Sequence, residues 1–151
     1  MLKDFIENRH FIFADSVENW EEAIKLSCKP FIDDATADEA YAQELVESVK
    51  KYGPYIVLMP GVALPHSQEG SGSVHKTSIS FMKLKNPVSF DENDADMYAD
   101  LFFTLASCNH DEHLKNMAKL SEMLLNEELV EKLHKVKNEE DLKKLSDEFN
   151  I

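Results

Sequence analysis

The chain has 151 residues, of which 43% are hydrophobic, and this length suits one domain built around one core. Its 29 acidic residues against 16 basic ones give a formal net charge of −13, which disfavours binding to nucleic acid or to an anionic membrane surface. Two cysteines are too few for a disulfide scaffold, and no apolar run reaches the roughly 18 residues that a membrane span needs. We therefore expect a single domain, residues 1–151, with reduced and buried cysteines, in the cytoplasm.

The first third of the chain carries alternating strand and helix signals. Residues 10–14 (HFIFA) have the apolar and aromatic composition of a strand, and apolar positions at helical spacing follow over residues 17–30. A second helix is predicted over residues 37–52, with a capping box that begins at Thr36 and a stop at Gly53. The opening unit is thus a strand followed by helices.

The next segment predicts a histidine at the end of a strand. Residues 55–59 (YIVLM) have strand composition, and Pro60-Gly61 separates them from a second short strand at residues 62–64. Pro65 and His66 follow directly. His66 is therefore expected at a strand end.

The rest of the chain predicts two more strands and then helices. Residues 77–84 alternate as a half-buried strand that Asn86-Pro87 should close, and residues 98–106 are apolar enough for a central strand. Helices are predicted from residue 111, around residues 129–136, and after a cap at Asn138. The expected fold class is α/β, a mixed β-sheet flanked by helices on both faces.

Three of the six histidines, His66, His110 and His113, fall at predicted strand ends or at a helix start. Such positions gather backbone N–H donors, which favour an anion such as a phosphoryl group. A histidine in isolation is more often structural, so this placement alone does not identify a site.

A longer motif identifies one. Residues 52–66 (YGPYIVLMPGVALPH) closely resemble the active-site segment of IIA proteins of the mannitol–fructose superfamily (EIIA type-2) of the phosphotransferase system (PTS), and are most similar to the L-ascorbate type. The family pattern continues through Trp20–Ile24, Leu84, Asn86-Pro87-Val88, Phe90, Asn93-Asp94 and Glu112-His113-Leu114. The resemblance thus covers nearly the whole chain.

This resemblance implies a phosphotransferase that works without a cofactor or a metal. His66 would be the phosphorylated nucleophile, through its Nε2 atom, and His113 would stabilise charge on the phosphate. The donor would be the histidine phosphocarrier protein HPr, the acceptor the cognate EIIB component, and the membrane component EIIC only an indirect partner. Imidazole suits this task because a large share of it is neutral at pH 7 and its phosphorylated form transfers readily.

The sequence departs from the family pattern around the expected phosphate. Ser67-Gln68 stand where ascorbate-type relatives commonly carry Ala-Arg, Ser73-Val74 replace a Gly-Val, and Lys50-Lys51 replace the Arg-Glu pair of mannitol and fructose relatives. The usual arginine is therefore absent, and we expect Ser67 and amides of the 67–73 loop to take its place. The sugar is not encoded in this chain, because a IIA protein contacts only proteins.

Both partners need in-line access to His66, so their footprints should overlap around residues 63–67. We expect a modest interface with an apolar centre that includes Val62 and Leu64 and with an acidic rim.

Two other functions stay open from sequence. A regulatory IIA-like phosphoprotein, uncoupled from transport, would carry the same histidine. A metal-dependent hydrolase could use His66, His110 and His113 with Asp111 or Glu112, although the HDEH run lacks the spacing of a H-E-x-x-H motif.

Overall fold

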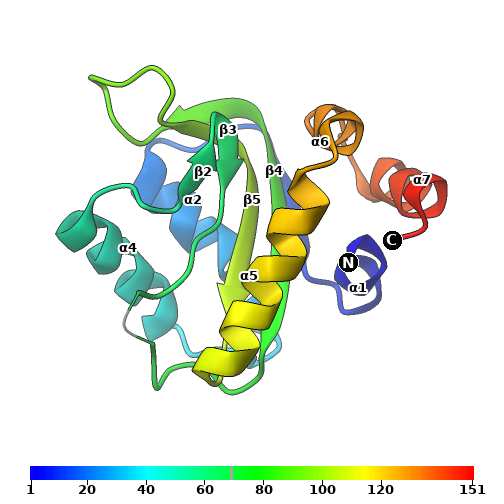
Figure 1. The fold of residues 1–151 in the computed structure, drawn as a ribbon. Helices are drawn as coiled ribbons and strands as arrows, with labels where there is room; N and C mark the ends of the chain where they lie inside the picture. Colours follow the sequence, from blue (N-terminus) through cyan, green and yellow to red (C-terminus); the bar gives the residue numbers. More distant parts are fainter. Residues whose placement is uncertain (69) are drawn as a thin grey trace.

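The computed structural model describes residues 1–68 and 70–151, and its elements alternate between helix and strand. In chain order they are α1 (Leu2–Glu7), β1 (Phe11–Ala14), α2 (Trp20–Ser27), α3 (Lys29–Asp33), α4 (Ala40–Tyr52), β2 (Val57–Met59), β3 (Gly61–Ala63), β4 (Ser78–Ser89), β5 (Tyr98–Ala106), α5 (His110–Leu124), α6 (Glu127–Leu133) and α7 (Glu139–Phe149). The strands form one sheet in the order β1-β4-β5-β3-β2 (Figure 1). β1 and β4 are parallel, as are β3 and β5, whereas the pairs β4–β5 and β2–β3 are antiparallel. The predicted mixed sheet is confirmed.

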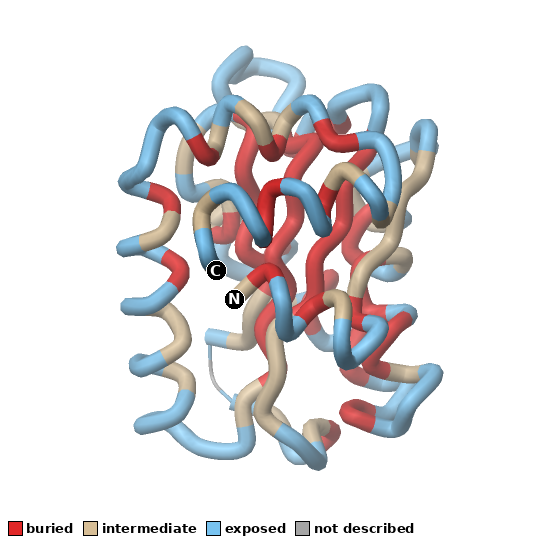
Figure 2. The backbone as a smooth tube through the Cα atoms, turned by 90° about the vertical axis from the view of Figure 1, so that its right-hand side faces the viewer, coloured by how far each residue is buried: buried red, intermediate tan, exposed pale blue. Residues whose placement is uncertain are grey.

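Helices cover both faces of this sheet, and each face has its own hydrophobic core. Helices α2, α3 and α4 pack on one face through residues such as Ile24, Phe31 and Leu45. Helices α1, α5, α6 and α7 pack on the other face (Figure 1), where the buried residues include Phe81 and Leu133. The buried positions concentrate along the central strands and on the inward sides of the helices (Figure 2).

The single tryptophan belongs to the first of these cores. Trp20, at the start of α2, stacks on Phe90 with ring centroids 5.9 Å apart and planes 28° apart. Phe90 in turn contacts Phe102 of β5, at a centroid distance of 6.2 Å. This aromatic row fixes α2 against the middle of the sheet.

Three boundaries differ from the prediction because tertiary contacts outweigh local signals. The chain opens with α1, which the sequence reading missed: its two buried residues, Leu2 and Phe5, are too few for a periodic pattern. The helix predicted to reach Pro30 ends at Ser27, and a separate helix, α3, carries Pro30 in its first turn, where no N–H is needed.

The ends of β4 and α4 also differ. β4 does not stop at Asn86-Pro87 but continues to Ser89, because a register shift between Lys83 and Val88 takes the proline out of the regular ladder. α4 begins at Ala40 rather than near residue 37, and Thr36 forms no capping box. Thr36 is instead buried, and its carbonyl oxygen accepts hydrogen bonds from the amides of His75 and Lys76.

A β-bulge at the start of β5 directs the carboxylate of Asp100 toward the second core. Gly61 pairs with Ala99 and Val62 with Leu101, so Asp100 is the extra residue. Nδ1 of His134 lies 2.9 Å from the Asp100 carboxylate. Nζ of Lys83 lies 3.0 Å from it on the other side.

These contacts keep the Asp100 carboxyl ionised, and they restrict which residue can occupy position 61. Burial alone would raise the pKa of the Asp100 carboxyl, but the hydrogen bonds from His134 and Lys83 hold that pKa below its ordinary value. Gly61 has φ +91°, and a Cβ atom there would lie 2.8 Å from Cε1 of His134. A side chain at residue 61 would therefore be strained by its backbone conformation and would have to displace the His134 ring.

Replacing Gly61 by alanine should lower the free energy of unfolding by roughly 2–4 kcal/mol, because backbone strain and a steric clash act together. Urea denaturation of Gly61→Ala, Gly70→Ala and Gly72→Ala separates the two terms. Gly70 has φ +81° but open space around it, and Gly72 has neither constraint. Equal stability of the three variants would show that the approach of His134 imposes nothing on residue 61.

Candidate functional site

His66 lies three residues beyond the end of β3, at the edge where β3 and β5 both finish. The amide of Leu105 in β5 donates to the carbonyl oxygen of Pro65 at 2.9 Å, which extends the pairing of the two strands to the residue before His66. The Tyr55 hydroxyl donates to the carbonyl oxygen of His66, and Oγ of Ser48 on α4 lies 2.9 Å from the same hydroxyl. The backbone of His66 is therefore held from the sheet and from α4.

The imidazole of His66 is fixed in one tautomer. Its Nδ1 lies 2.5 Å from the carbonyl oxygen of Leu64, and a carbonyl oxygen can only accept, so Nδ1 carries the proton. The Tyr55 ring stands edge-on to the imidazole, with centroids 5.1 Å apart and planes at 90°. The lone pair of the neutral ring is consequently on Nε2.

Burial also keeps this ring neutral. Desolvation lowers the pKa of His66 below its ordinary value, and the hydrogen bond to Leu64 offsets only part of that effect. A neutral imidazole with a free Nε2 is a nucleophile at pH 7 without a general base.

His113 faces His66 from the first turn of α5. Asn109 caps this helix, its side chain accepting from the amide of Glu112 at 2.9 Å. The rings of His66 and His113 have centroids 5.3 Å apart and planes 33° apart. The predicted pair of histidines is thus brought together.

The second histidine has its own anchor. Nδ1 of His113 lies 3.2 Å from Oγ of Ser107, in the turn between β5 and α5. Desolvation lowers the pKa of His113, and the nearby rings of His66 and His110 lower it further. Both rings of the pair are therefore largely neutral at pH 7, and an arriving dianion would favour protonation of His113.

A cavity of about 540 Å³ opens beside His113 and includes Ser67, the residue after His66, in its lining. It is lined by Ser67, Ser107, Asn109, His110 and His113, among others, and it includes the N-terminal end of α5. That end presents backbone N–H groups and a positive helix dipole. Among the described residues that line this cavity there is no lysine or arginine, so an anion there would depend on hydroxyl, imidazole and amide donors.

The loop that replaces the family's arginine is described in part. Ser67 donates from its hydroxyl to the carbonyl oxygen of Gly70 at 2.8 Å, and Gln68 is exposed. Glu69 lies outside the described residues. That Ser67 and the amides of this loop substitute for arginine remains a prediction.

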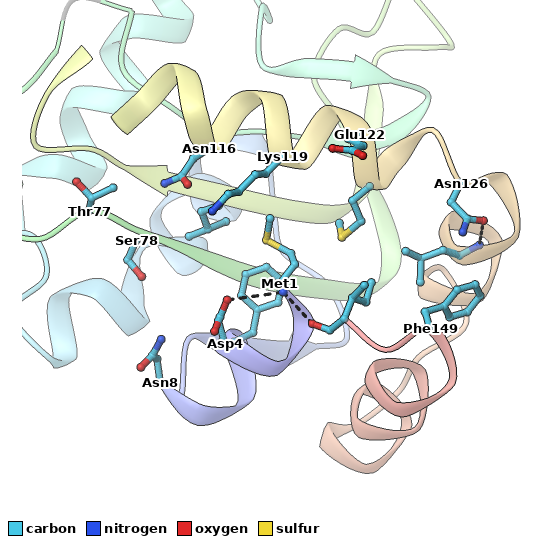
Figure 3. Close-up of a pocket in the computed structure, with 15 residues that line it drawn as sticks. Met1, Asp4, Asn8, Thr77, Ser78, Asn116, Lys119, Glu122, Asn126 and Phe149 are labelled. Carbon is cyan, nitrogen blue, oxygen red and sulfur yellow. Dashed lines mark hydrogen bonds and ion pairs between the residues drawn. The ribbon is translucent and has the colours of Figure 1, made fainter. Parts of the chain in front are cut away.

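A second cavity, of about 620 Å³, lies between α1 and α5 (Figure 3). Asn116, Lys119 and Glu122 of α5 border it on one side, and Asp4 and Asn8 of α1 border it on the other. Neither His66 nor His113 lines it. Its lining also includes Thr77, whose hydroxyl donates to Glu112 on the turn of α5 that carries His113.

Comparison with known proteins decides the family. A family profile described as "Phosphoenolpyruvate-dependent sugar phosphotransferase system, EIIA 2" matches residues 4–148. The chain belongs to this family. It is therefore an EIIA component, a phosphocarrier of a phosphotransferase system, as its resemblance predicts.

Individual relatives agree with this assignment. The mannitol-specific cryptic phosphotransferase enzyme IIA component of Escherichia coli (strain K12) is 33% identical over 141 residues, 93% of this chain and 94% of the relative. The ascorbate-specific PTS system EIIA component of the same strain is 28% identical over 151 residues, 99% of this chain and 97% of the relative. The similarity to the ascorbate type is thus matched by similarity to a mannitol type.

Solved structures share the fold of this EIIA chain. The solution structure of the mannitol-specific cryptic enzyme IIA from Escherichia coli superposes with a TM-score of 0.82 at 31% identity, covering 95% of this chain and 96% of that one. The mannitol enzyme IIA in complex with phosphorylated enzyme IIB, also from Escherichia coli, has a TM-score of 0.77 at 23% identity, with coverage of 90% and 92%.

Other expectations from the sequence agree with the EIIA structure only in part. Within residues 1–68 and 70–151, no group of three His, Cys, Asp or Glu side chains is arranged to hold a metal ion, so the hydrolase alternative has no ligand set there.

Cys28 is buried, and burial raises the pKa of its thiol to about 12. Cys108 is exposed, contrary to expectation, because it lies in the turn before α5. No helix in the described part of the chain has the length and apolarity to cross a bilayer.

Two supports of the site were missed from the sequence. Tyr55 and Ser107 anchor the backbone of one histidine and the ring of the other. Tyr55 lies inside the 52–66 motif, but the strand composition of that motif does not predict a hydrogen bond to the His66 carbonyl. Ser107 precedes His113 by six residues, a spacing that predicts no contact until the turn is known.

NMR of the imidazole nitrogens checks the tautomer and the charge of His66. We expect the Nδ1–H form and a pKa below that of the same residue in the urea-unfolded chain, because burial penalises the charged ring. Since the unfolded ring then takes up its proton first, stability conferred by His66 is fully present above the unfolded pKa and decreases as the pH falls below it. An Nε2–H tautomer, or a pKa equal to the unfolded value, would contradict this geometry.

Tyr55→Phe should lower stability by about 1–2 kcal/mol and slow phosphorylation, because it leaves the His66 carbonyl without its hydroxyl donor. Ser48→Ala is the matched variant: it removes the hydroxyl beside Tyr55 but leaves the bond to His66, so its effect on phosphorylation should be smaller. Chemical denaturation and the rate of phosphoryl uptake measure the two effects. Equal rates in Tyr55→Phe and the parent chain would rule out positioning by this hydroxyl.

Proposed function

We propose that Nε2 of His66 is the atom that carries the phosphoryl group, received from HPr and delivered to the cognate EIIB component. The observation that carries this proposal is the hydrogen bond of 2.5 Å between Nδ1 of His66 and Leu64. It leaves Nε2 as the nitrogen with a lone pair. Family membership supplies the phosphoryl chemistry.

In the transfer step the phosphoryl group passes directly from the donor histidine to His66. Nε2 of His66 attacks phosphorus in line, the bond between phosphorus and the donor nitrogen breaks, and its electron pair returns to the donor ring. The proton on Nδ1 stays in place, so positive charge develops on the His66 ring. The Leu64 carbonyl dipole stabilises that charge.

His113 is proposed to stabilise the phosphoryl group once it has arrived. Its Nδ1 is engaged by Ser107, and its ring lies beside that of His66. A dianion on His66 raises the pKa of a neighbouring imidazole, so His113 becomes a cationic donor when it is needed. The α5 N-terminus adds its dipole to the same field.

The partner surface must differ from the one expected from sequence. Val62 and Leu64 are 0% and 2% exposed and cannot contact a partner, because β3 lies inside the sheet between β5 and β2. Leu114, next to His113, is 53% exposed and supplies an apolar contact at the site. Asp111 and Glu112 on the same turn are exposed acidic neighbours.

Shared access to His66 makes the relay sequential. HPr and EIIB each have to bring a reacting atom to one Nε2, so they bind in turn. An IIB partner is supported by the solved complex of a structurally similar mannitol IIA with phosphorylated IIB. In this proposal the chain works in the cytoplasm, and the membrane component EIIC meets only EIIB.

His66→Ala should abolish phosphorylation and leave the fold intact, because the ring is only partly buried at a strand end. The test is mass spectrometry after incubation with phosphoenolpyruvate, enzyme I and HPr. The parent chain should gain the mass of one phosphoryl group and the variant none. Full labelling of folded His66→Ala would refute the assignment.

His113→Ala should fold and still accept phosphate, but with a transfer rate reduced roughly 100- to 1,000-fold, as for loss of a charge-stabilising donor. His75→Ala is the matched control, because it removes an exposed imidazole that does not line the cavity beside His113. Rapid-quench kinetics in both directions measure the effect. Equal rates in the two variants would make His113 a surface residue without a role.

A further inference from the structure

A third cavity, of about 770 Å³, lies at the end of the sheet opposite His66. Its floor is the end of β1 with Lys83 and Lys85 of β4, and its wall is residues 134–137, the connection between α6 and α7. In Figure 1 this connection lies away from the start of α5. The phosphoryl site does not extend to it.

The floor of this cavity is rigidly built around a buried cation. Lys83 is 6% exposed, and its ammonium group is held 3.0 Å from the Asp100 carboxylate while donating to the Leu84 carbonyl. Asp100 reaches this position through the β5 bulge, and His134 fits over Gly61 because that residue has no Cβ. The contacts among Lys83, Asp100 and His134 thus depend on the bulge in β5 and on a glycine with φ +91°. The phosphoryl chemistry at His66 uses none of them.

The rim of the cavity carries positively charged side chains, whereas the chain as a whole is acidic. Lys85, Lys135 and Lys137 line it in addition to Lys83. Lys135 is paired at 3.4 Å with Glu131. In the part of the chain that is described, the ammonium groups of Lys85 and Lys137 have no carboxylate within 4.0 Å.

The residues that line the cavity include four lysines and one carboxylate, that of Asp15. Three further carboxylates contact these lysines from outside the lining: Asp100 at Lys83, Glu131 at Lys135, and Asp141 at the backbone amide of Lys137. The whole chain carries a formal charge of −13. Because the chain as a whole is acidic, two unpaired ammonium groups beside this cavity form a local site that attracts anions.

We propose that this cavity binds a small phosphate monoester. Lys85 and Lys137 would contact the phosphate, because they are the cations that lack a partner, and a dianion satisfies two ammonium groups. Phe13 and Val136 offer apolar wall for a short carbon skeleton, which favours an ester over inorganic phosphate. The volume lies within the range of small-molecule sites.

Titration with glycerol 3-phosphate tests this proposal, followed by NMR of backbone amides and by calorimetry at fixed ionic strength. We expect saturable shifts in residues 83–85 and 134–137, weaker binding of inorganic phosphate and none of glycerol. The double variant Lys85→Ala/Lys137→Ala should raise the dissociation constant at least tenfold. Both side chains are exposed, so the variant should remain folded.

The matched control is Lys115→Ala/Lys144→Ala, which removes two exposed lysines elsewhere and should leave the affinity unchanged. His66→Ala should also bind normally, so failure of the phosphoryl-carrier proposal and failure of this one are distinguishable. Absence of saturable shifts, equal weakening in the two double variants, or equal affinity for inorganic phosphate would overturn the ester site. Tighter binding of a glutamate-rich peptide would overturn it in favour of an acidic protein partner.

Discussion

The hydrogen bond from Nδ1 of His66 to the carbonyl oxygen of Leu64 is the constraint on which the site depends. It joins a side chain to the backbone two residues earlier, so it forms only if the chain bends between Leu64 and His66. Pro65 fixes its own φ at this bend, and its carbonyl is held by Leu105 of β5. The tautomer of one ring is thereby set by where β3 ends in the sheet.

The same strand end determines what can approach the ring. β5 finishes beside it, and the chain turns through Ser107 and Asn109 into α5, which brings His113 and a helix N-terminus to the free nitrogen. Tyr55 closes the opposite side by contacting both the ring and the carbonyl group of His66. Within the described residues Nε2 has no hydrogen-bond partner, and groups that favour an anion lie around the ring.

The sequence predicts most of this arrangement, and the failures have physical reasons. The sheet strands and His66 were identifiable because apolar runs and a long motif mark them, and Asn138 does cap α7 as expected. α1 was not predictable, since its contribution is two side chains that become meaningful only against Phe81 and Phe103. The burial of Val62 and Leu64 follows from the strand order, which no local pattern contains. The Asp100 bulge is equally non-local, because it exists only as a mismatch between two paired strands.

The stacking of Trp20 on Phe90 has a consequence for how unfolding of this protein is observed. With one tryptophan in the chain, intrinsic fluorescence reports on the core under α2, α3 and α4 and is blind to the layer formed by α1, α5, α6 and α7. Detachment of α1 together with α7, which pack on each other through the two chain ends, would leave the emission unchanged. Amide hydrogen exchange reads both layers, so any difference between the two methods measures how independently the two faces of the sheet open.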